Sequence, residues 1–319
     1  MKKKNVLFIL GILCLIVSIV CIFVLFKEKN TETSNDLTKN YHNISENGVN
    51  YTYDSSIVSI LFMGIDSTDS DTMGQADSLQ LYLLNREEKS IQVLSLSRDA
   101  MTDIRLFDVE HNDLGWDRQH LGLAYAYGSS PKNGASLTSQ AVSRMLNDIP
   151  IVHFVAMDLS ELKEVQNVVG SLEVKVPNDS LADIHPDWTK GSTALIDADN
   201  VEDFVRTRDI KEDFSNSERM ERQKAYLNAY VTKIRAMLKG DFDNTVSKLY
   251  SVSQHMTTNI SLEDIQTFAQ MLLEYSYNEE EDFYTLPGKD QTGKNHDEFE
   301  IDKEQLNQLI LELFYKRED

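Results

Sequence analysis

Cysteine is nearly absent from this chain of 319 residues. The two that occur, Cys14 and Cys21, both fall in an apolar stretch near the N-terminus. The remainder therefore has no disulfide and no thiol chemistry, and it depends on an ordinary hydrophobic core. No HExxH, GxSxG, Walker A or CxxC pattern is found, and the seven histidines are scattered. What remains is carboxylates and arginines, the side chains of metal-assisted phosphoryl chemistry.

Basic residues are scarce as well, with 31 Lys and Arg against 52 Asp and Glu and a net charge of −21. Such a chain repels nucleic acid and offers no polybasic route to anionic lipid. Against this background the segment 201–230, VEDFVRTRDIKEDFSNSERMERQKAYLNAY, concentrates arginines at positions 206, 208, 219 and 222. Either they pair with the acids of the same segment, or they converge on an anionic ligand.

The first 29 residues carry a long uncharged run, from Val6 to Phe26. About twenty apolar residues suffice to span a bilayer. A cleaved signal peptide, the alternative, has a shorter apolar region and a small-residue cleavage site. The sequence therefore predicts a cytoplasmic stub and transmembrane anchor over 1–29. Lys2, Lys3 and Lys4 favour a cytoplasmic N-terminus, which places the rest of the chain outside the cell membrane of a Gram-positive-type bacterium.

Beyond the anchor, the polar residues 30–55 predict a linker, and residues 56–319 predict one folded domain. Its periodicity mixes strands and helices without a repeat, which indicates an α/β fold of the α-β-α sandwich kind, with a central mixed sheet flanked by helices. Strands are expected at 56–66, 77–85, 90–97, 151–158, 171–176 and 282–288, with a hairpin turn at 86–90. Helices are expected at 121–128, 134–148, 159–170, 215–238, 244–256, 261–276 and 303–315.

The arginine-rich segment has a spacing that suits a phosphate or pyrophosphate clamp. If FVRTR is extended, Arg206 and Arg208 point to the same side. Residues 215–218, SNSE, match the S-x-x-E capping box that starts a helix, and Arg219 and Gln223 then share one face of its first turns. A helix N-terminus attracts anions, and the planar guanidinium binds phosphate oxygens in pairs.

Acidic residues mark the ends of the three expected N-terminal strands. Asp66 follows the first strand, Asp77 begins the second, and Arg98 and Asp99 follow the third. Two carboxylates, together with a phosphate oxygen and waters, make a suitable site for Mg²⁺ or Mn²⁺. The alternative is that Asp66 and Asp77 are ordinary turn or cap residues.

Six motifs follow one another in a fixed order between about residues 56 and 316. They are ILFMGID (60–66), QADSLQLYLLNREEKSIQVLSLSRDA (75–100), LGLAYAYG (121–128), IVHFVAMDLSELKEVQNVVGSLEVKVP (151–177), VEDFVRTR with SERMERQ (201–208 and 217–223), and TLPGK with IDKEQLNQLILELF (285–289 and 301–314). Taken together they resemble the LytR–CpsA–Psr family of bacterial cell-wall glycopolymer ligases. Each motif is weak alone, and their shared order carries the resemblance.

The resemblance implies a membrane-anchored phosphotransferase. Such an enzyme takes an anionic glycopolymer (teichoic acid, capsule or similar) from a polyprenyl-pyrophosphate carrier and joins it to peptidoglycan, with Mg²⁺ or Mn²⁺ at the pyrophosphate. A hydrophobic cleft between sheet and helices would receive the lipid. By motif position, Asp66 and Asp77 become the metal-linked carboxylates, and Arg98 and Asp99 the catalytic pair, with Asp99 a candidate general base. The pyrophosphate clamp would consist of Arg98, Arg206, Arg208, Arg219 and Gln223.

This chain departs from the family pattern at four positions. Gln75 and Asn216 stand where an arginine and an aspartate are usual, and Ser97 and Gly122 replace a proline and an asparagine. Losing one charge-assisted contact costs about 1.5–3 kcal/mol. Two alternatives therefore stay open: a non-catalytic, regulatory envelope protein that binds the polyprenyl-pyrophosphate carrier, and a pyrophosphatase that acts on that carrier with water.

Overall fold

The centre of the protein is a six-stranded mixed sheet. A computed structural model describes residues 43–67, 73–207, 215–278, 281–293 and 297–318. The strand order is β11-β8-β3-β4-β5-β12, in which β3, β4 and β5 are antiparallel neighbours, β8 runs parallel to β3, and β12 runs parallel to β5. The strands are β3 (Ile57–Asp66), β4 (Gln75–Asn85), β5 (Ser90–Leu96), β8 (His153–Asp158), β11 (Thr257–Thr258) and β12 (Phe283–Thr285).

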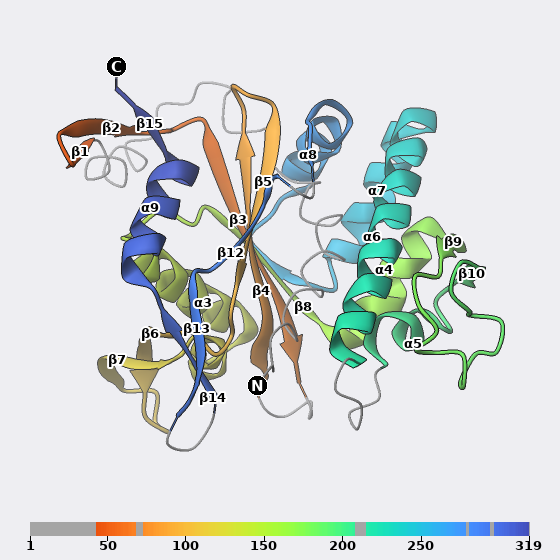
Figure 1. The fold of residues 1–319 in the computed structure, drawn as a ribbon, viewed down its shortest axis with the longest axis horizontal. Helices are drawn as coiled ribbons and strands as arrows, with labels where there is room; N and C mark the ends of the chain where they lie inside the picture. Colours follow the sequence, from red (N-terminus) through yellow and green to blue (C-terminus); the bar gives the residue numbers. More distant parts are fainter. Residues whose placement is uncertain (1–42, 68–72, 208–214, 279–280, 294–296, 319) are drawn as a thin grey trace.

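Helices cover both faces of this sheet, which makes three layers (Figure 1). One side carries α4 (Leu162–Val169), α5 (Val201–Arg206), α6 (Ser215–Gly240), α7 (Phe242–Ser253) and α8 (Leu262–Glu274). The other side carries the 3-10 helix η1 (Leu121–Tyr127), α3 (Pro131–Met145) and α9 (Lys303–Phe314). The predicted α/β fold with a central mixed sheet is therefore confirmed.

Alternation along the central strands explains why one sheet supports two cores. Phe62 and Tyr82 are buried in the core under α4, α6, α7 and α8, whereas their neighbours Leu61 and Leu81 are buried in the core under α3 and α9. Successive side chains of a strand point to opposite faces, so a strand covered on both sides is apolar at nearly every position. The continuous apolar runs in the sequence have this origin.

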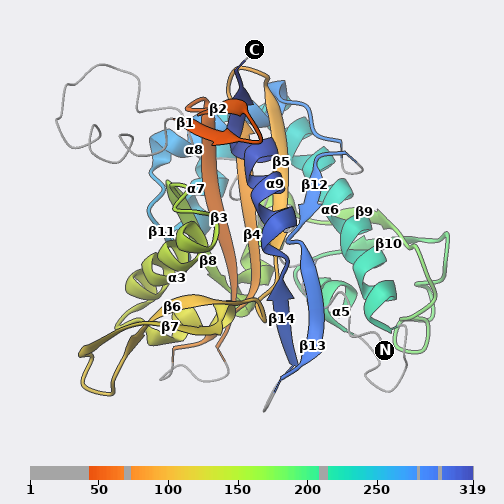
Figure 2. The same ribbon diagram turned by 60° about the vertical axis from the view of Figure 1, so that its left-hand side comes forward.

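Small sheets extend the edges of the molecule (Figure 2). The hairpin of β6 (Met101–Phe107) and β7 (Asp113–His120) follows the end of β5, and no strand was predicted there although Thr102 and Ile104 alternate as buried positions. The other small sheets are the pair β9 (Leu172–Lys175) and β10 (Thr193–Ile196), the pair β13 (Gly288–Thr292) and β14 (Asp297–Ile301), and a three-stranded sheet of β1 (Asn43–Glu46), β2 (Val49–Tyr53) and β15 (Tyr315–Arg317).

The three-stranded sheet changes the interpretation of the linker. The polar composition of residues 43–53 predicted that they belong to the linker, but they form β1 and β2. Strand β2 pairs with the C-terminal strand β15, with Tyr53 opposite Tyr315. The rings of these two tyrosines meet edge to face at 5.7 Å. The folded region therefore includes residues before Ser56. The predicted anchor lies outside the described residues, among which no helix combines the length and apolar character needed to cross a membrane.

Candidate active site

Asp77 lies in a β-bulge at the start of β4. Gly64 of β3 pairs with Ser78, but the next residue, Ile65, pairs with Ala76, so Asp77 is the extra residue on its strand. A bulge bends its strand and redirects a side chain, and bulges are frequent beside active sites. Asp66 ends β3 in the same corner of the sheet, paired with Gln75 of β4. The strand ends thus bring both predicted metal-linked carboxylates to one edge.

Arg98 lies against two acidic side chains, those of Asp77 and Asp99. Its Nη1 atom is 2.5 Å from Oδ1 of Asp77, and its Nε atom is 3.5 Å from Oδ1 of Asp99. The Arg98 side chain is still 40% exposed, so part of the guanidinium remains open to a ligand. The structure therefore brings Arg98, Asp99 and Asp77 together as the motif positions implied.

The electrostatics of this corner are dominated by acid. Burial raises the pKa of Asp77, and the adjacent Arg98 guanidinium lowers it. The carboxylates of Asp66 and Asp99 raise it further, and the net result is a pKa above the ordinary value. Asp77 thus has two carboxylates and one guanidinium close to it. The excess negative charge favours a cation at this edge, because the like charges of carboxylates destabilise one another.

The turn that carries Arg98 and Asp99 is fixed by three backbone hydrogen bonds, which come from η1 and β14. Gly122 of η1 donates its N–H to the carbonyl oxygen of Arg98 at 2.8 Å, and Phe299 of β14 donates to the carbonyl of Asp99 at 2.8 Å. Leu121 donates to the carbonyl of Ala100 at 2.9 Å. The functional side chains therefore project from a backbone held on several sides, as a preorganised site requires.

Gly122 makes the closest of these approaches. A Cβ atom at this position would lie 2.8 Å from the carbonyl oxygen of Ala76 and 3.2 Å from Cβ of Arg98. Only glycine therefore allows η1 to approach both the bulged strand and the Arg98 turn. Sequence reasoning noted Gly122 as a departure from the family asparagine but did not identify this packing role.

Arg206 is placed differently from the prediction. The segment is not extended there: α5 includes Arg206 as its last residue, and Thr207 is the first extended one. The helix forms because Val201, Phe204 and Val205 are buried at helical spacing. Arg206 is exposed, and its Nη1 atom lies 3.5 Å from Oε2 of Glu202. An ion pair this exposed contributes little to the free energy of folding. The Arg206 guanidinium can therefore leave Glu202 and bind a ligand at little cost.

The remaining members of the predicted clamp are not placed by the structure. Arg208 lies outside the described residues. Arg219 and Gln223 are in the first turns of α6, which begins at Ser215 as the capping pattern predicted, but their side chains are not among those described. Their convergence with Arg98 and Arg206 therefore stays a prediction, as does the effect of Asn216 on the same helix.

Arg222 has a structural role. It is buried, with 1% of its surface exposed, and it donates from Nε to the carbonyl oxygen of Phe204 at 2.9 Å. It also donates to the carbonyl of Thr207 and to the hydroxyl of Ser180. These bonds join α6 to the end of α5 and to the loop after β9. Arg222 therefore fixes the backbone that carries Arg206, without itself reaching solvent.

Comparison with known proteins identifies the family. A profile of the LytR_cpsA_psr family matches residues 20–314. The chain belongs to this family. A teichoic acid transferase named TagU from Enterococcus faecalis is 32% identical over 216 residues, which are 66% of this chain and 64% of that protein. The Bacillus subtilis transferase TagT is 30% identical over 217 residues, which are 65% of this chain and 61% of that protein.

These alignments span less than two thirds of the length of either curated relative. Both relatives are named polyisoprenyl-teichoic acid–peptidoglycan teichoic acid transferase. Among solved structures, Bacillus subtilis TagV superposes with a TM-score of 0.59 at 25% identity, over 81% of this chain and 97% of that one. The three-layered architecture is therefore that of LytR_cpsA_psr proteins.

A divalent cation fits the donor set of this family member. Asp66 and Asp77 supply hard carboxylate oxygens at the acidic edge, and Mg²⁺ or Mn²⁺ commonly takes only one or two protein carboxylates, completing its shell with phosphate oxygens and water. Among the described residues, no group of three or more His, Cys, Asp or Glu side chains is arranged to hold a metal ion. The binding of Mg²⁺ or Mn²⁺ by Asp66 and Asp77 therefore stays a prediction.

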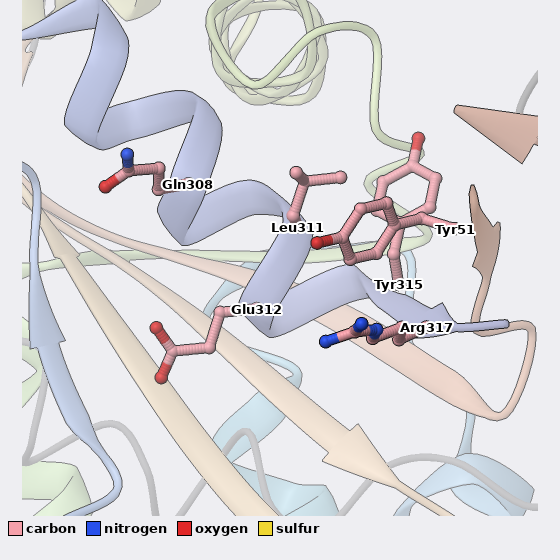
Figure 3. A pocket seen from close by; sticks show the side chains of 6 residues that line it. All are labelled: Tyr51, Gln308, Leu311, Glu312, Tyr315 and Arg317. Atoms are coloured by element: carbon pink, nitrogen blue, oxygen red, sulfur yellow. The ribbon is translucent and has the colours of Figure 1, made fainter. Parts of the chain in front are cut away.

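Side chains of α6 pack against the central sheet in part of the region where a lipid cleft was expected. Tyr226 and Tyr230 of α6 are fully buried in the core with Phe62 and Tyr82. Two hollows lie elsewhere, one of them about 340 Å³ in volume between β2, α9 and β15, with residues Tyr51, Gln308, Leu311, Glu312, Tyr315 and Arg317 around it (Figure 3). The cleft therefore stays a prediction.

Proposed function

We propose that this protein is a membrane-anchored phosphotransferase. It transfers an anionic glycopolymer (teichoic acid, capsule or a similar polymer) from a polyprenyl-pyrophosphate carrier to peptidoglycan. The observation that carries the proposal is the position of Arg98 beside Asp77 and Asp99 at the edge of the sheet, in a chain of the LytR_cpsA_psr family. The names of the curated relatives support the donor and the acceptor. Residues 6–26 would hold the enzyme in the cell membrane as a single-pass anchor, with the catalytic domain outside.

In the proposed reaction, a sugar hydroxyl of peptidoglycan attacks the phosphorus that carries the polymer. The new P–O bond forms a phosphodiester, the phosphoanhydride bond breaks, and polyprenyl phosphate leaves with the electron pair. Arg98 would bind the oxygens on which charge develops, and Asp99 would take the proton of the attacking hydroxyl. Asp66 and Asp77 would hold Mg²⁺ or Mn²⁺, which when bound neutralises part of the pyrophosphate charge.

Arg98→Ala tests this proposal most directly. The full chain in detergent is given a polyprenyl-pyrophosphate-linked polymer, peptidoglycan and Mg²⁺, and attached phosphodiester is measured. We expect the variant to lose at least about 2.7 kcal/mol of transition-state stabilisation, which is a rate loss of about a hundredfold or more. Arg317→Ala, which removes an exposed arginine of β15, serves as the control. Transfer by Arg98→Ala at the parent rate refutes the proposed site.

A specific observation also favours carrier binding without transfer. Gln75 pairs directly with Asp66 across the sheet, at the position where the family usually has arginine. Directly paired residues of antiparallel strands have Cβ atoms about 5 Å apart, so an arginine here would reach the proposed pyrophosphate site. If the missing guanidinium limits catalysis, Gln75→Arg should raise transfer about tenfold or more. Unchanged carrier binding with no transfer in both forms would support the binding protein instead.

The pyrophosphatase alternative uses the same site with water as the nucleophile. The two enzymes differ in their need for an acceptor. Without peptidoglycan, the transferase should release little polymer phosphate, whereas the pyrophosphatase should release it at its full rate. The measurement is the ratio of phosphate-terminated polymer to peptidoglycan-linked polymer, with and without acceptor. Release at the full rate without acceptor refutes the transferase assignment.

A further inference from the structure

The β6–β7 hairpin grows directly out of the candidate active site. Asp99 is separated from β6 by Ala100 alone, and β7 ends at His120, immediately before η1. The bond from the Leu121 N–H to the Ala100 carbonyl closes the base of the hairpin at 2.9 Å. From this base the hairpin projects beyond the body of the molecule (Figure 2). A long ligand bound along the hairpin would therefore extend to the candidate active site at Asp99.

One face of the hairpin presents an aromatic platform. Arg105 pairs with Trp116 and Asp103 pairs with Arg118 in the strand register, so these four side chains share one face, which we call the hairpin face. Trp116 is 39% exposed. The guanidinium carbon of Arg144, from α3, lies 4.9 Å from the centroid of its ring. A cation over an indole ring is an attractive contact, and it holds the ring in place while leaving part of it open to solvent.

The charges around this platform are paired. Arg144 Nε lies 3.2 Å from Oδ2 of Asp103, and Arg118 Nη2 lies 2.5 Å from Oε2 of Glu300. Arg105 forms an ion pair with Asp113. Each pair is partly exposed, so guanidinium donors and carboxylate acceptors stand beside the ring without a net charge. This balance of positive and negative charge differs from the rest of the chain, in which acidic residues are in excess.

Such a face fits an uncharged saccharide better than a polyanion. The C–H face of a pyranose packs on an exposed indole, and its hydroxyl groups both donate and accept hydrogen bonds, as the carboxylates and guanidiniums here require. A polyanion would meet carboxylates at each ion pair, and the net charge of −21 would repel it at longer range. The amino-sugar backbone of peptidoglycan is uncharged, because its carboxyl groups are joined to peptides.

A membrane surface is the other partner to consider, because the end of the hairpin is apolar in part. Val109 is 99% exposed and Leu114 is 64% exposed. The same tip, however, carries Asp108, Glu110 and Asp113. Carboxylates at the tip oppose insertion into a bilayer, and they are repelled by anionic lipid. The charge pattern therefore favours the glycan.

We propose that the hairpin face binds the glycan strand of the acceptor and leads its reacting hydroxyl to Asp99. Trp116 is the central contact, and Arg118 and Asp103 bind the hydroxyl groups beside it. This proposal rests on the proposed function, because it assigns the acceptor side of that reaction. It concerns binding, however, and can be measured without any transfer.

The test is binding of the full chain, in detergent, to insoluble peptidoglycan by co-sedimentation and to a soluble N-acetylglucosamine oligomer by calorimetry. We expect Trp116→Ala to weaken both at least tenfold, and Trp116→Phe to stay within about threefold of the parent because it keeps an aromatic face. Ile184→Ala removes another apolar side chain, 56% exposed in the loop after β9, and should bind like the parent. In transfer assays, Trp116→Ala should raise the KM for acceptor and leave the KM for donor unchanged.

Two results would overturn the proposal. The first is glycan binding by Trp116→Ala at the parent level. The second is loss of binding to phosphatidylglycerol vesicles in Trp116→Ala while glycan binding is kept, which assigns the hairpin to the membrane. Arg98→Ala separates this proposal from the one on which it rests. That variant should bind glycan like the parent while losing transfer, so a failure of the transferase assignment leaves the glycan measurement intact.

Discussion

The guanidinium of Arg98 contacts the carboxylate of Asp77 at 2.5 Å across 21 residues of sequence. One comes from the turn after β5 and the other from the bulge at the start of β4. The contact exists because two antiparallel strands place their ends together and the bulge turns Asp77 toward the corner. The same geometry brings Asp66 and Asp99 close enough to raise the pKa of Asp77. The site is therefore a single electrostatic unit.

Replacing Asp77 by asparagine keeps the shape of the side chain and removes its charge. The pKa of Asp77 is raised, so its charged form is disfavoured in the fold, and removing the charge should change the free energy of unfolding by less than about 1 kcal/mol, toward higher stability. Transfer should fall at least about tenfold, and the concentration of Mg²⁺ needed for half-maximal rate should rise, because a hard ligand is lost. The measurement is initial rate against Mg²⁺ concentration. Asp183→Asn, in an exposed loop, is the matched control, and an unchanged Mg²⁺ dependence of Asp77→Asn contradicts the assigned role.

Replacing Gly122 by alanine should disturb the site through the backbone. The new Cβ would meet the carbonyl oxygen of Ala76 at 2.8 Å, and neither backbone has a flexible end to move away. We expect η1 to shift, the bond to the Arg98 carbonyl to lengthen, and the free energy of unfolding to fall by about 1–3 kcal/mol. The rate of transfer should fall about tenfold or more.

Gly240→Ala provides the comparison for that variant. Gly240 ends α6, and a Cβ there would meet nothing within 4 Å. Its replacement should leave transfer unchanged and shift stability by no more than about 1 kcal/mol, in the stabilising direction. The measurements are the free energy of unfolding in urea and the transfer rate, each compared between Gly122→Ala and Gly240→Ala. Equal behaviour of the two glycine variants would show that the close approach at Gly122 is unimportant.

Replacing Arg222 by alanine should destabilise the fold strongly. The substitution leaves the carbonyl oxygens of Phe204 and Thr207 without this donor in a buried place, and it also opens a cavity. Each unpaired buried polar group costs about 1–3 kcal/mol, so a total loss of at least about 3 kcal/mol is expected. Lys233→Ala, on the exposed side of the same helix, should change stability by less than about 0.5 kcal/mol. Urea unfolding measures both, and similar small losses would contradict the structural role of Arg222.

His153 should make stability depend on pH. It is buried, its Nδ1 atom has no hydrogen-bond partner among the described residues, and burial lowers its pKa despite the opposing charge of Asp264. Below about pH 6.5 the unfolded chain binds a proton that the folded chain resists, so this group makes stability fall from there down to the folded pKa. Above about pH 6.5 it has no effect.

His153→Phe removes that titration and keeps an aromatic ring beside Phe268, whose centroid is 6.4 Å from that of His153. The difference in unfolding free energy between pH 7.5 and pH 5.5 should therefore be smaller in the variant than in the parent. Each unit by which the folded pKa is lowered corresponds to about 1.4 kcal/mol. Denaturant unfolding at the two pH values measures it. An equal pH dependence in both proteins would show that other groups cause it.

The elements with long and regular patterns were predictable from sequence. The runs 60–65 and 79–84 are mostly apolar, and they form the middle of two central strands that are buried at nearly every position. The helix expected over 215–238 is α6, and the turn at 86–89 closes the predicted hairpin. These predictions succeeded because strand and helix periods are properties of a few neighbouring residues.

Short elements were harder to predict. Val201, Phe204 and Val205 carry the spacing of one helical face, yet the alternation of Arg206 and Arg208 indicated an extended segment, which was wrong for Arg206. The strands at 43–53 are polar because the small sheet they form is only partly buried. In both cases the pattern spans too few residues to separate a helix, a strand and a linker.

By itself, the sequence determined the apolar runs of the sheet, the order of motifs that marks the family, and the choice of carboxylates and arginines as the candidate reactive groups. Only the tertiary structure decided that Asp77 lies in a bulge against Arg98, that Gly122 packs against Ala76 and Arg98, and that Arg222 is buried instead of facing a ligand. The reason is physical. Periodicity is a property of residues that are close in sequence, whereas a contact between distant residues depends on the path of the whole backbone between them.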